Sequence, residues 1–257
     1  MKKWITFDLD GTLMQNPFGK WVFPEIEQLY NDCIGDDQAN GIRSELIKEH
    51  RRRMKAGLIV DAYDWDDIVR HVFSTNGVFV HVDVAELLVK HTKPPKVYLL
   101  EENILQDLQI LREKGFNLAV VTNGFEKYQK PVMDALGLTS FFDVIITPEK
   151  ARYGKPQINM VKELHDTNNE IVAHVGDRLD HDVTMANELN VLSILFHQEM
   201  PETILSVDPK KRQYTCMDWL EMKWKRETGV ETLPLPLSAI PKMIICTMKE
   251  ISMESLS

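Results

Sequence analysis

Two aspartates near the start of the chain, Asp8 and Asp10, follow a short apolar run and are followed in turn by Gly11 and Thr12. Side chains two positions apart on an extended segment point the same way, so both carboxyl groups can face one pocket. One carboxylate can attack phosphorus, while the second can protonate the leaving oxygen and later activate water. Because Asp and Gly are also ordinary turn residues, this segment alone fits a polar strand end equally well.

Two later segments carry groups that suit the same chemistry. Thr122 and Asn123 end the apolar run 117–121, where a hydroxyl and backbone N–H groups can bind phosphoryl oxygens. Lys155 stands before a proline at the start of a predicted helix, and an ammonium held there can neutralise a carboxylate nucleophile and the phosphoryl oxygens. Each segment by itself also fits a strand-ending turn or a solvated surface lysine.

An acidic loop, residues 176–182, directly follows the apolar run 171–175. Its acids Asp177, Asp180 and Asp182 repel one another unless a cation lies among them. Carboxylate oxygens are ligands that Mg²⁺ prefers, so the loop is a candidate magnesium site. Asp180 or Asp182 also fits the N-cap of a following helix, and one of the acids is expected to act only in that way.

The elements around these segments alternate between helical periodicity and apolar runs after residue 96. This alternation predicts an α/β fold, in which a doubly wound parallel sheet is covered by helices in three layers. The carboxyl ends of such strands lie at one edge, so the polar segments are expected to meet there. The predicted strands are 3–8, 117–121, 143–146, 171–175 and 191–195, and the predicted helices are 101–114, 126–136, 157–166 and 181–189.

Residues 16–95 interrupt this alternation with helical periodicity and almost no strand signal. One helical face in this stretch carries large apolar side chains at i, i+3, i+4, i+7 and i+8, namely Trp65, Ile68, Val69, Val72 and Phe73. We therefore expect residues 16–95 to form a small helical domain. It would be inserted into a core domain of residues 1–15 and 96–228.

The end of the chain gives a weaker pattern. Residues 212–226 predict a last strand and a helix, whereas residues 229–257 have no clear period and include a Leu-Pro-rich stretch. We expect residues 229–257 to form a loosely docked tail of uncertain structure.

Composition narrows the class of protein. The chain has 257 residues, of which 44% are hydrophobic, so it can bury a full core. Its formal net charge of -9 argues against nucleic acid or an anionic membrane surface as a partner. The three cysteines are far apart and indicate neither a disulfide framework nor a metal site, and no stretch resembles a signal peptide or a membrane span. We expect a cytoplasmic monomer or homodimer.

Taken together in chain order, the polar segments resemble the four motifs of the haloacid dehalogenase (HAD) superfamily of hydrolases. The matching residues are Asp8 to Thr12, Thr122, Lys155 and Gly176 to Asp182. The resemblance covers residues 1 to about 15 and 96 to about 226. It implies a Rossmann-like core, with the helical domain as an inserted cap that closes over the site.

The resemblance also implies catalytic roles. Asp8 would attack phosphorus, and Asp10 would transfer protons to the leaving group and from water. Thr122 and Lys155, with Asn123 beside them, would hold the phosphoryl group of the substrate.

The same resemblance implies magnesium as the cofactor. Asp8 would bind Mg²⁺ through its carboxylate and Asp10 through its backbone carbonyl oxygen. Asp177 would complete the metal shell, while Asp182 would orient ligands or waters around it.

The implied activity is hydrolysis of small-molecule phosphate monoesters through an aspartyl-phosphate. Dehalogenating members of the family lack an acid at the position of Asp10, so phosphate chemistry is favoured here. A phosphoryl-transferring mutase, a phosphonate-cleaving relative and a non-catalytic binding protein remain alternatives. The sequence does not identify the phosphate ester that is the substrate. The basic residues of the insert are expected to be solvated: Arg43, Arg51, Arg52, Arg53 and Lys55.

Overall fold

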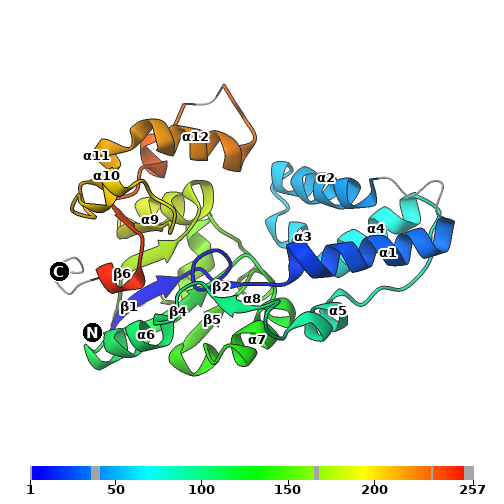
Figure 1. Ribbon diagram of the computed structural model, residues 1–257, viewed down its shortest axis with the longest axis horizontal. Coiled ribbons are helices and arrows are strands. Elements are labelled where there is room, and N and C mark those ends of the chain that lie inside the picture. The colour runs from blue at the N-terminus through cyan, green and yellow to red at the C-terminus, as the bar shows by residue number, and fades with distance from the viewer. Residues whose placement is uncertain (1, 36–40, 165–167, 233, 252–257) are drawn as a thin grey trace.

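A six-stranded sheet forms the centre of the molecule in the computed structural model, which describes residues 2–35, 41–164, 168–232 and 234–251. Its strand order is β5-β4-β1-β6-β7-β8, and neighbouring strands are parallel throughout. The strands span Lys2–Phe7 (β1), Asn117–Val121 (β4), Val144–Ile146 (β5), Asn169–Gly176 (β6), Leu192–Phe196 (β7) and Met243–Ile245 (β8). The predicted parallel α/β sheet is confirmed (Figure 1).

The central strand β1 brings three strand ends to the same level. Residues Trp4 to Phe7 are all buried, as expected for a parallel strand that is covered on both faces. Phe7, the last residue of β1, is aligned with Val120 of β4 and Val175 of β6. The segments that follow these strands therefore begin side by side at one edge of the sheet.

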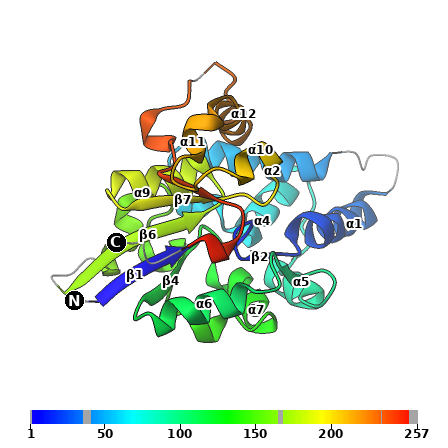
Figure 2. The same ribbon diagram turned by 60° about the vertical axis from the view of Figure 1, so that its left-hand side comes forward.

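Helices cover both faces of the sheet and complete the predicted three layers. Leu108 of α6 belongs to the same apolar cluster as Phe7, whereas Met185 of α9 packs in a second cluster with Val121 on the opposite face. Figure 2 shows α6 and α7 on the other side of the sheet from α9. The covering elements are α6 (Ile104–Glu113), α7 (Glu126–Ala135), α8 (Pro148–Ala151), a 3₁₀ segment (Ile158–Leu164), α9 (Thr184–Glu188) and α10 (Glu202–Leu205).

The segment between the first and second polar motifs is helical, as predicted. We call residues 18–91 the helical insert, and Figure 1 places it to one side of the sheet. The short strands Met14–Gln15 (β2) and Tyr98–Leu99 (β3) pair where the chain leaves and rejoins the core. The helices of the insert are α1 (Phe23–Ile34), α2 (Ile42–Lys55), α3 (Ile59–Ala62), α4 (Trp65–Thr75) and α5 (Val84–His91). The predicted apolar face of α4 is buried, with Trp65 half-buried at its start.

One of the basic residues of the insert is not solvated. Arg53 is buried, and its guanidinium lies 2.8 Å from Glu49 and 2.7 Å from Asp67. The expectation of a wholly solvated basic face is wrong for Arg53, because these two acids compensate its charge inside the insert.

The end of the chain is a second correction. Residues 234–251 are not loosely docked, since β8 adds to β7 with Ile194 aligned to Met243. The buried guanidinium of Arg212 donates to Ile244 O at 3.0 Å and to Glu250 Oε1 at 2.6 Å, which fastens this segment. The strand predicted in 212–226 is wrong, because that range forms the helices α11 (Arg212–Thr215) and α12 (Met217–Thr228). An apolar run of three residues was too short to predict β8.

The helical elements near the sheet edge also differ in detail from expectation. The predicted helix 157–166 is a 3₁₀ segment as far as Leu164, and its last two residues lie outside the described residues. The predicted helix 181–189 begins with a π-helical turn, Leu179–Val183, before α9. Within the described ranges, no helix combines the length and the apolar character that crossing a bilayer requires.

Candidate active site

The loop after β1 lies at the carboxyl edge of the sheet. Asp8 is buried, and its backbone N–H donates to Val175 O at 2.8 Å, which fixes the loop against β6. The chain turns at Gly11 with φ +83°, where a Cβ atom would lie 2.7 Å from Asp177 Oδ2. Glycine is needed there both for its backbone conformation and because the Asp177 carboxylate approaches so closely.

Lys155 lies between two carboxylates. Its Nζ is 2.5 Å from Asp8 Oδ1 and 2.6 Å from Asp182 Oδ1, and the three side chains are buried. Burial disfavours the ammonium, but the charges of Asp182 and Asp8 outweigh this and raise the pKa of Lys155 above its usual value. The ammonium therefore stays charged and compensates Asp8, the predicted nucleophile, in a buried site.

Asp182 is held by several donors at once. Besides Lys155, its carboxylate meets His174 Nε2 at 3.0 Å and accepts from Arg178 N at 3.0 Å. A Cβ on Gly176 would lie 2.1 Å from Asp182 Cγ, so glycine lets this side chain lie against the strand end. Burial raises the pKa of Asp182, but Lys155 and His174 lower it more, and the group stays ionised. Its geometry is that of a carboxylate that positions Lys155.

Three carboxylates of the site could together hold a metal ion. Asp8, Asp177 and Asp182 each offer a carboxylate oxygen, and these atoms all lie within 4.8 Å of one another. Burial, together with the neighbouring carboxylates, raises the pKa of Asp8 to about 6 and raises that of Asp177 well above its usual value. The donors are the hard oxygens that Mg²⁺ prefers, and a divalent cation would relieve their repulsion.

Asp10 belongs to the loop after β1, and its carboxylate is bound by Gln129 instead of by Lys155. Gln129 of α7 donates through Nε2 to Asp10 Oδ2 at 2.6 Å. A Cβ on Gly124 would lie 2.0 Å from that Nε2, so glycine leaves room for the amide. Burial raises the pKa of Asp10, and the bond from Gln129 offsets part of this. Gln129 lies on a helix face where its spacing gives no functional signal, so sequence reasoning missed it.

Two buried polar atoms in this loop have no hydrogen-bond partner within the described residues. They are Asp10 Oδ1 and Thr12 Oγ1. Buried polar atoms are normally paired, so atoms of this kind beside clustered carboxylates fit a site that receives a polar ligand.

Thr122 and Asn123, which follow β4, make different contacts. The buried Thr122 hydroxyl accepts from Gly124 N at 3.1 Å. The Asn123 amide instead holds the backbone of Lys155, accepting from its N–H at 2.7 Å and donating to its carbonyl oxygen at 3.1 Å. These contacts make Asn123 a support for Lys155. Binding of substrate phosphate by Thr122 and Asn123 stays a prediction.

The helical insert contacts the core at this edge of the sheet. Asn123 donates to the hydroxyl of Tyr63 in the insert at 3.3 Å. Further along, Asp66 Oδ2 accepts from Tyr128 Oη at 2.9 Å and from Lys127 Nζ at 2.5 Å, both on α7. The insert is thus fastened to the core beside the candidate site, through contacts that no local sequence pattern signals.

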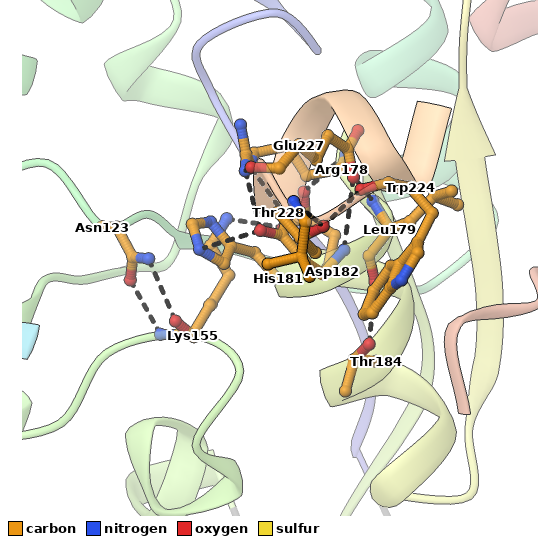
Figure 3. A network of polar contacts seen from close by, with 12 residues as sticks. Asn123, Lys155, Arg178, Leu179, His181, Asp182, Thr184, Trp224, Glu227 and Thr228 are labelled. Carbon is orange, nitrogen blue, oxygen red and sulfur yellow. Dashed lines mark hydrogen bonds and ion pairs between the residues drawn. The ribbon is translucent and has the colours of Figure 1, made fainter. Parts of the chain in front are cut away.

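The last turn of α12 binds the backbone of the acidic loop (Figure 3). Glu227 Oε2 accepts from the backbone N–H of Leu179 at 2.8 Å and of Asp180 at 3.3 Å. Arg178 pairs with Asp180 at 2.8 Å and donates to Glu227 O at 3.5 Å. Sequence reasoning placed a helix here but did not connect it to the site.

Comparison with known proteins agrees with this geometry. The family model of haloacid dehalogenase-like hydrolases matches residues 2–190 of the chain. The chain belongs to this family. The predicted HAD core is therefore confirmed over the part of the chain that carries all four polar segments.

This HAD hydrolase is similar to proteins that are named as phosphatases and to a solved structure. A glyceraldehyde 3-phosphate phosphatase of Methanocaldococcus jannaschii is 27% identical over 211 residues, which cover 76% of this chain and 84% of the relative. A ribulose-1,5-bisphosphate 5-phosphatase of Halopiger xanaduensis is 32% identical over 207 residues, 75% of this chain and 83% of the relative. The crystal structure of a HAD phosphatase from Thermococcus onnurineus has a TM-score of 0.61 at 25% identity, covering 79% of this chain and 89% of that one.

Proposed function

We propose that this HAD hydrolase is a magnesium-dependent phosphatase that cleaves small-molecule phosphate monoesters through a phosphoryl group carried on Asp8. The observation that supports this most directly is the buried Lys155 ammonium, 2.5 Å from Asp8 Oδ1, beside the Asp177 carboxylate. A neutralised carboxylate at a strand end can approach an anionic phosphate, which an isolated one would repel. The phosphatase names of both curated relatives support the same class of reaction.

The first step uses Asp8 and Asp10 in complementary roles. A carboxylate oxygen of Asp8 attacks phosphorus, and the bond between phosphorus and the ester oxygen breaks. Asp10 gives its proton to that oxygen, so an alcohol leaves and the phosphoryl group stays on Asp8. Gln129 holds one oxygen of Asp10 at 2.6 Å and orients the carboxyl group for this transfer.

The second step returns the enzyme to its starting state. Asp10, now ionised, accepts a proton from water while the water oxygen attacks phosphorus. The bond to Asp8 breaks, and free phosphate leaves. Lys155, held by Asp182 and by the Asn123 amide, stabilises the phosphoryl oxygens in both steps.

Magnesium would be held by Asp8, by the backbone carbonyl of Asp10 and by Asp177, with Asp182 orienting the site. When bound, it supplies positive charge that screens the nucleophile from the phosphate and stabilises the oxygens of the transferring group.

The helical insert is proposed to act as a cap. Tyr63 reaches Asn123, next to Lys155, so a closed insert keeps bulk water away from the phosphoryl group. A cap of this kind favours small substrates over polymers, in keeping with the acidic net charge of the chain.

A substrate screen tests the reaction class. The purified protein is incubated with millimolar Mg²⁺ and sugar phosphates, nucleotides, short-chain phosphate esters and an aryl phosphate. We expect free phosphate, no release after chelation, and recovery when Mg²⁺ is restored. An isomerised sugar phosphate without net phosphate release would indicate a mutase instead. No turnover across the panel would favour a binding protein.

A further inference from the structure

A cavity of about 420 Å³ lies between the helical insert and the end of the core. Its walls come from three separate parts of the chain: α2 of the insert, the acidic loop and the last turn of α12. Figure 1 shows α2 and α12 on the same side of the molecule, facing one another. The phosphatase steps above do not use this cavity.

The charges that line the cavity do not cancel. Arg51 and Lys55 of α2 and Arg226 of α12 are exposed cavity residues, and in the described chain none of them forms an ion pair. The other charged groups of the wall are already compensated, since Arg178 pairs with Asp180 at 2.8 Å and Glu227 pairs with Lys223 at 2.8 Å. These cations, unpaired among the described residues, therefore face one cavity in a protein of net charge -9.

The cavity adjoins the candidate active site on the side of the insert. Asp180 and His181, which line it, lie in the loop between the site residues Asp177 and Asp182. His50, on the opposite wall, packs its ring edge to face against Tyr63 with centroids 5.0 Å apart. Tyr63 in turn contacts the Asn123 amide, which holds the backbone of Lys155, so direct contacts join the wall of the cavity to the site.

Hydrogen bonds join α12, which forms one wall of the cavity, to the acidic loop of the site. Glu227 accepts from two consecutive backbone N–H groups of the acidic loop, at Leu179 and Asp180. Arg226 precedes Glu227 on α12, so the hydrogen bonds that Glu227 makes fix the backbone that carries Arg226 relative to that loop. A cation beside a reaction centre can discriminate between substrates by their second charge.

We infer that this cavity is a subsite for a second anionic group on the substrate, remote from the phosphate that is cleaved. The inference rests on the proposed phosphatase function and names its substrate class: small phosphate monoesters that carry a further phosphate or carboxylate. Arg51, Lys55 and Arg226 bind that group, and the neighbouring acids keep the rest of the wall neutral.

Paired variants test the subsite. Arg226→Gln and Arg51→Gln each remove one cavity cation, whereas Lys225→Gln removes an equal charge from the same turn as Arg226 without touching the cavity. We measure kcat/KM for a sugar bisphosphate, a phosphorylated carboxylic acid and an aryl phosphate. Each cavity variant is expected to lose roughly tenfold on the preferred doubly anionic ester, equivalent to about 1.4 kcal/mol. The aryl phosphate rate stays within twofold, and Lys225→Gln matches the unaltered enzyme.

The outcomes separate the subsite from the reaction class. A larger loss on the bisphosphate identifies a second phosphate as the bound group, and a larger loss on the phosphorylated acid identifies a carboxylate. Equal losses on all three esters, or an effect of Lys225→Gln as large as that of Arg226→Gln, would overturn the subsite alone. No hydrolysis of the aryl phosphate or any other ester by the unaltered protein would overturn the phosphatase function and the subsite with it.

Discussion

At the scale of single residues, glycines decide how closely the charged groups of the site approach one another. Gly11 leaves space for the Asp177 carboxylate, and Gly176 leaves space for that of Asp182. The Lys155 ammonium then lies between Asp8 and Asp182. The electrostatics of the site thus depend on the space that these glycines leave as well as on the charged groups themselves.

Gly11→Ala should weaken metal binding. The backbone at φ +83° costs a non-glycine residue about 1–2 kcal/mol, and the new Cβ would meet Asp177 Oδ2 at 2.7 Å. We expect the Mg²⁺ concentration for half-maximal activity to rise roughly tenfold or more, because a metal-site carboxylate is displaced. Gly19→Ala is the control, since a Cβ at that position would have no neighbour within 4 Å. Unchanged magnesium activation would contradict the proposed role of Asp177.

The sequence predicted those site residues that follow a strand. Asp8, Thr122 and Asp177 stand at the ends of apolar runs, and parallel strands end at one edge, so their convergence follows from the fold class. Gln129 and Tyr63 were not predictable in this way. They reach the site from α7 and from the turn between α3 and α4, and the packing of both elements depends on the whole tertiary structure.

At the scale of secondary structure, the end of the chain is part of the sheet. β8 extends β7, and Arg212 and Glu250 fasten it from within the protein. Its apolar run, Met243–Ile245, is too short to distinguish a strand from a loop by periodicity. The other five strands of this sheet were predicted from apolar runs, four of which alternate with predicted helices.

Ile244→Ala tests whether β8 is structural. Ile244 is fully buried, so the substitution should lower the free energy of unfolding by about 2–5 kcal/mol. Leu237→Ala is the matched control, because that side chain is 86% exposed and should change stability by less than about 0.5 kcal/mol. Urea unfolding monitored by circular dichroism measures both. Equal stabilities would mean that the segment is a loosely docked tail after all.

At the scale of the whole molecule, the site lies where three parts of the chain meet. The core supplies the carboxylates proposed to react, the helical insert contacts the site through Tyr63, and α12 supports the acidic loop. Asp66 is central to this closure, since it joins the insert to Lys127 and Tyr128 of α7.

Asp66→Asn should loosen the insert. Lys127 loses the nearer of its two acidic partners and keeps Asp64 at 3.6 Å, so a half-exposed contact is weakened. We expect KM to rise about two- to fivefold, together with a larger radius of gyration in X-ray scattering. Asp83→Asn is the control, because Asp83 caps α5 within the insert, where its carboxylate accepts from Glu86 N. If Asp66→Asn changed neither quantity, the insert would be held by other contacts.

The most direct measurement is mass analysis of the peptide that contains Asp8 after rapid acid quench of a turnover reaction. We expect a peptide heavier by one phosphoryl group, whose modification maps to Asp8, and no such species or turnover in a folded Asp8→Asn variant. Sustained turnover by Asp8→Asn, or a phosphoryl group on another residue, would contradict the role of Asp8 as nucleophile.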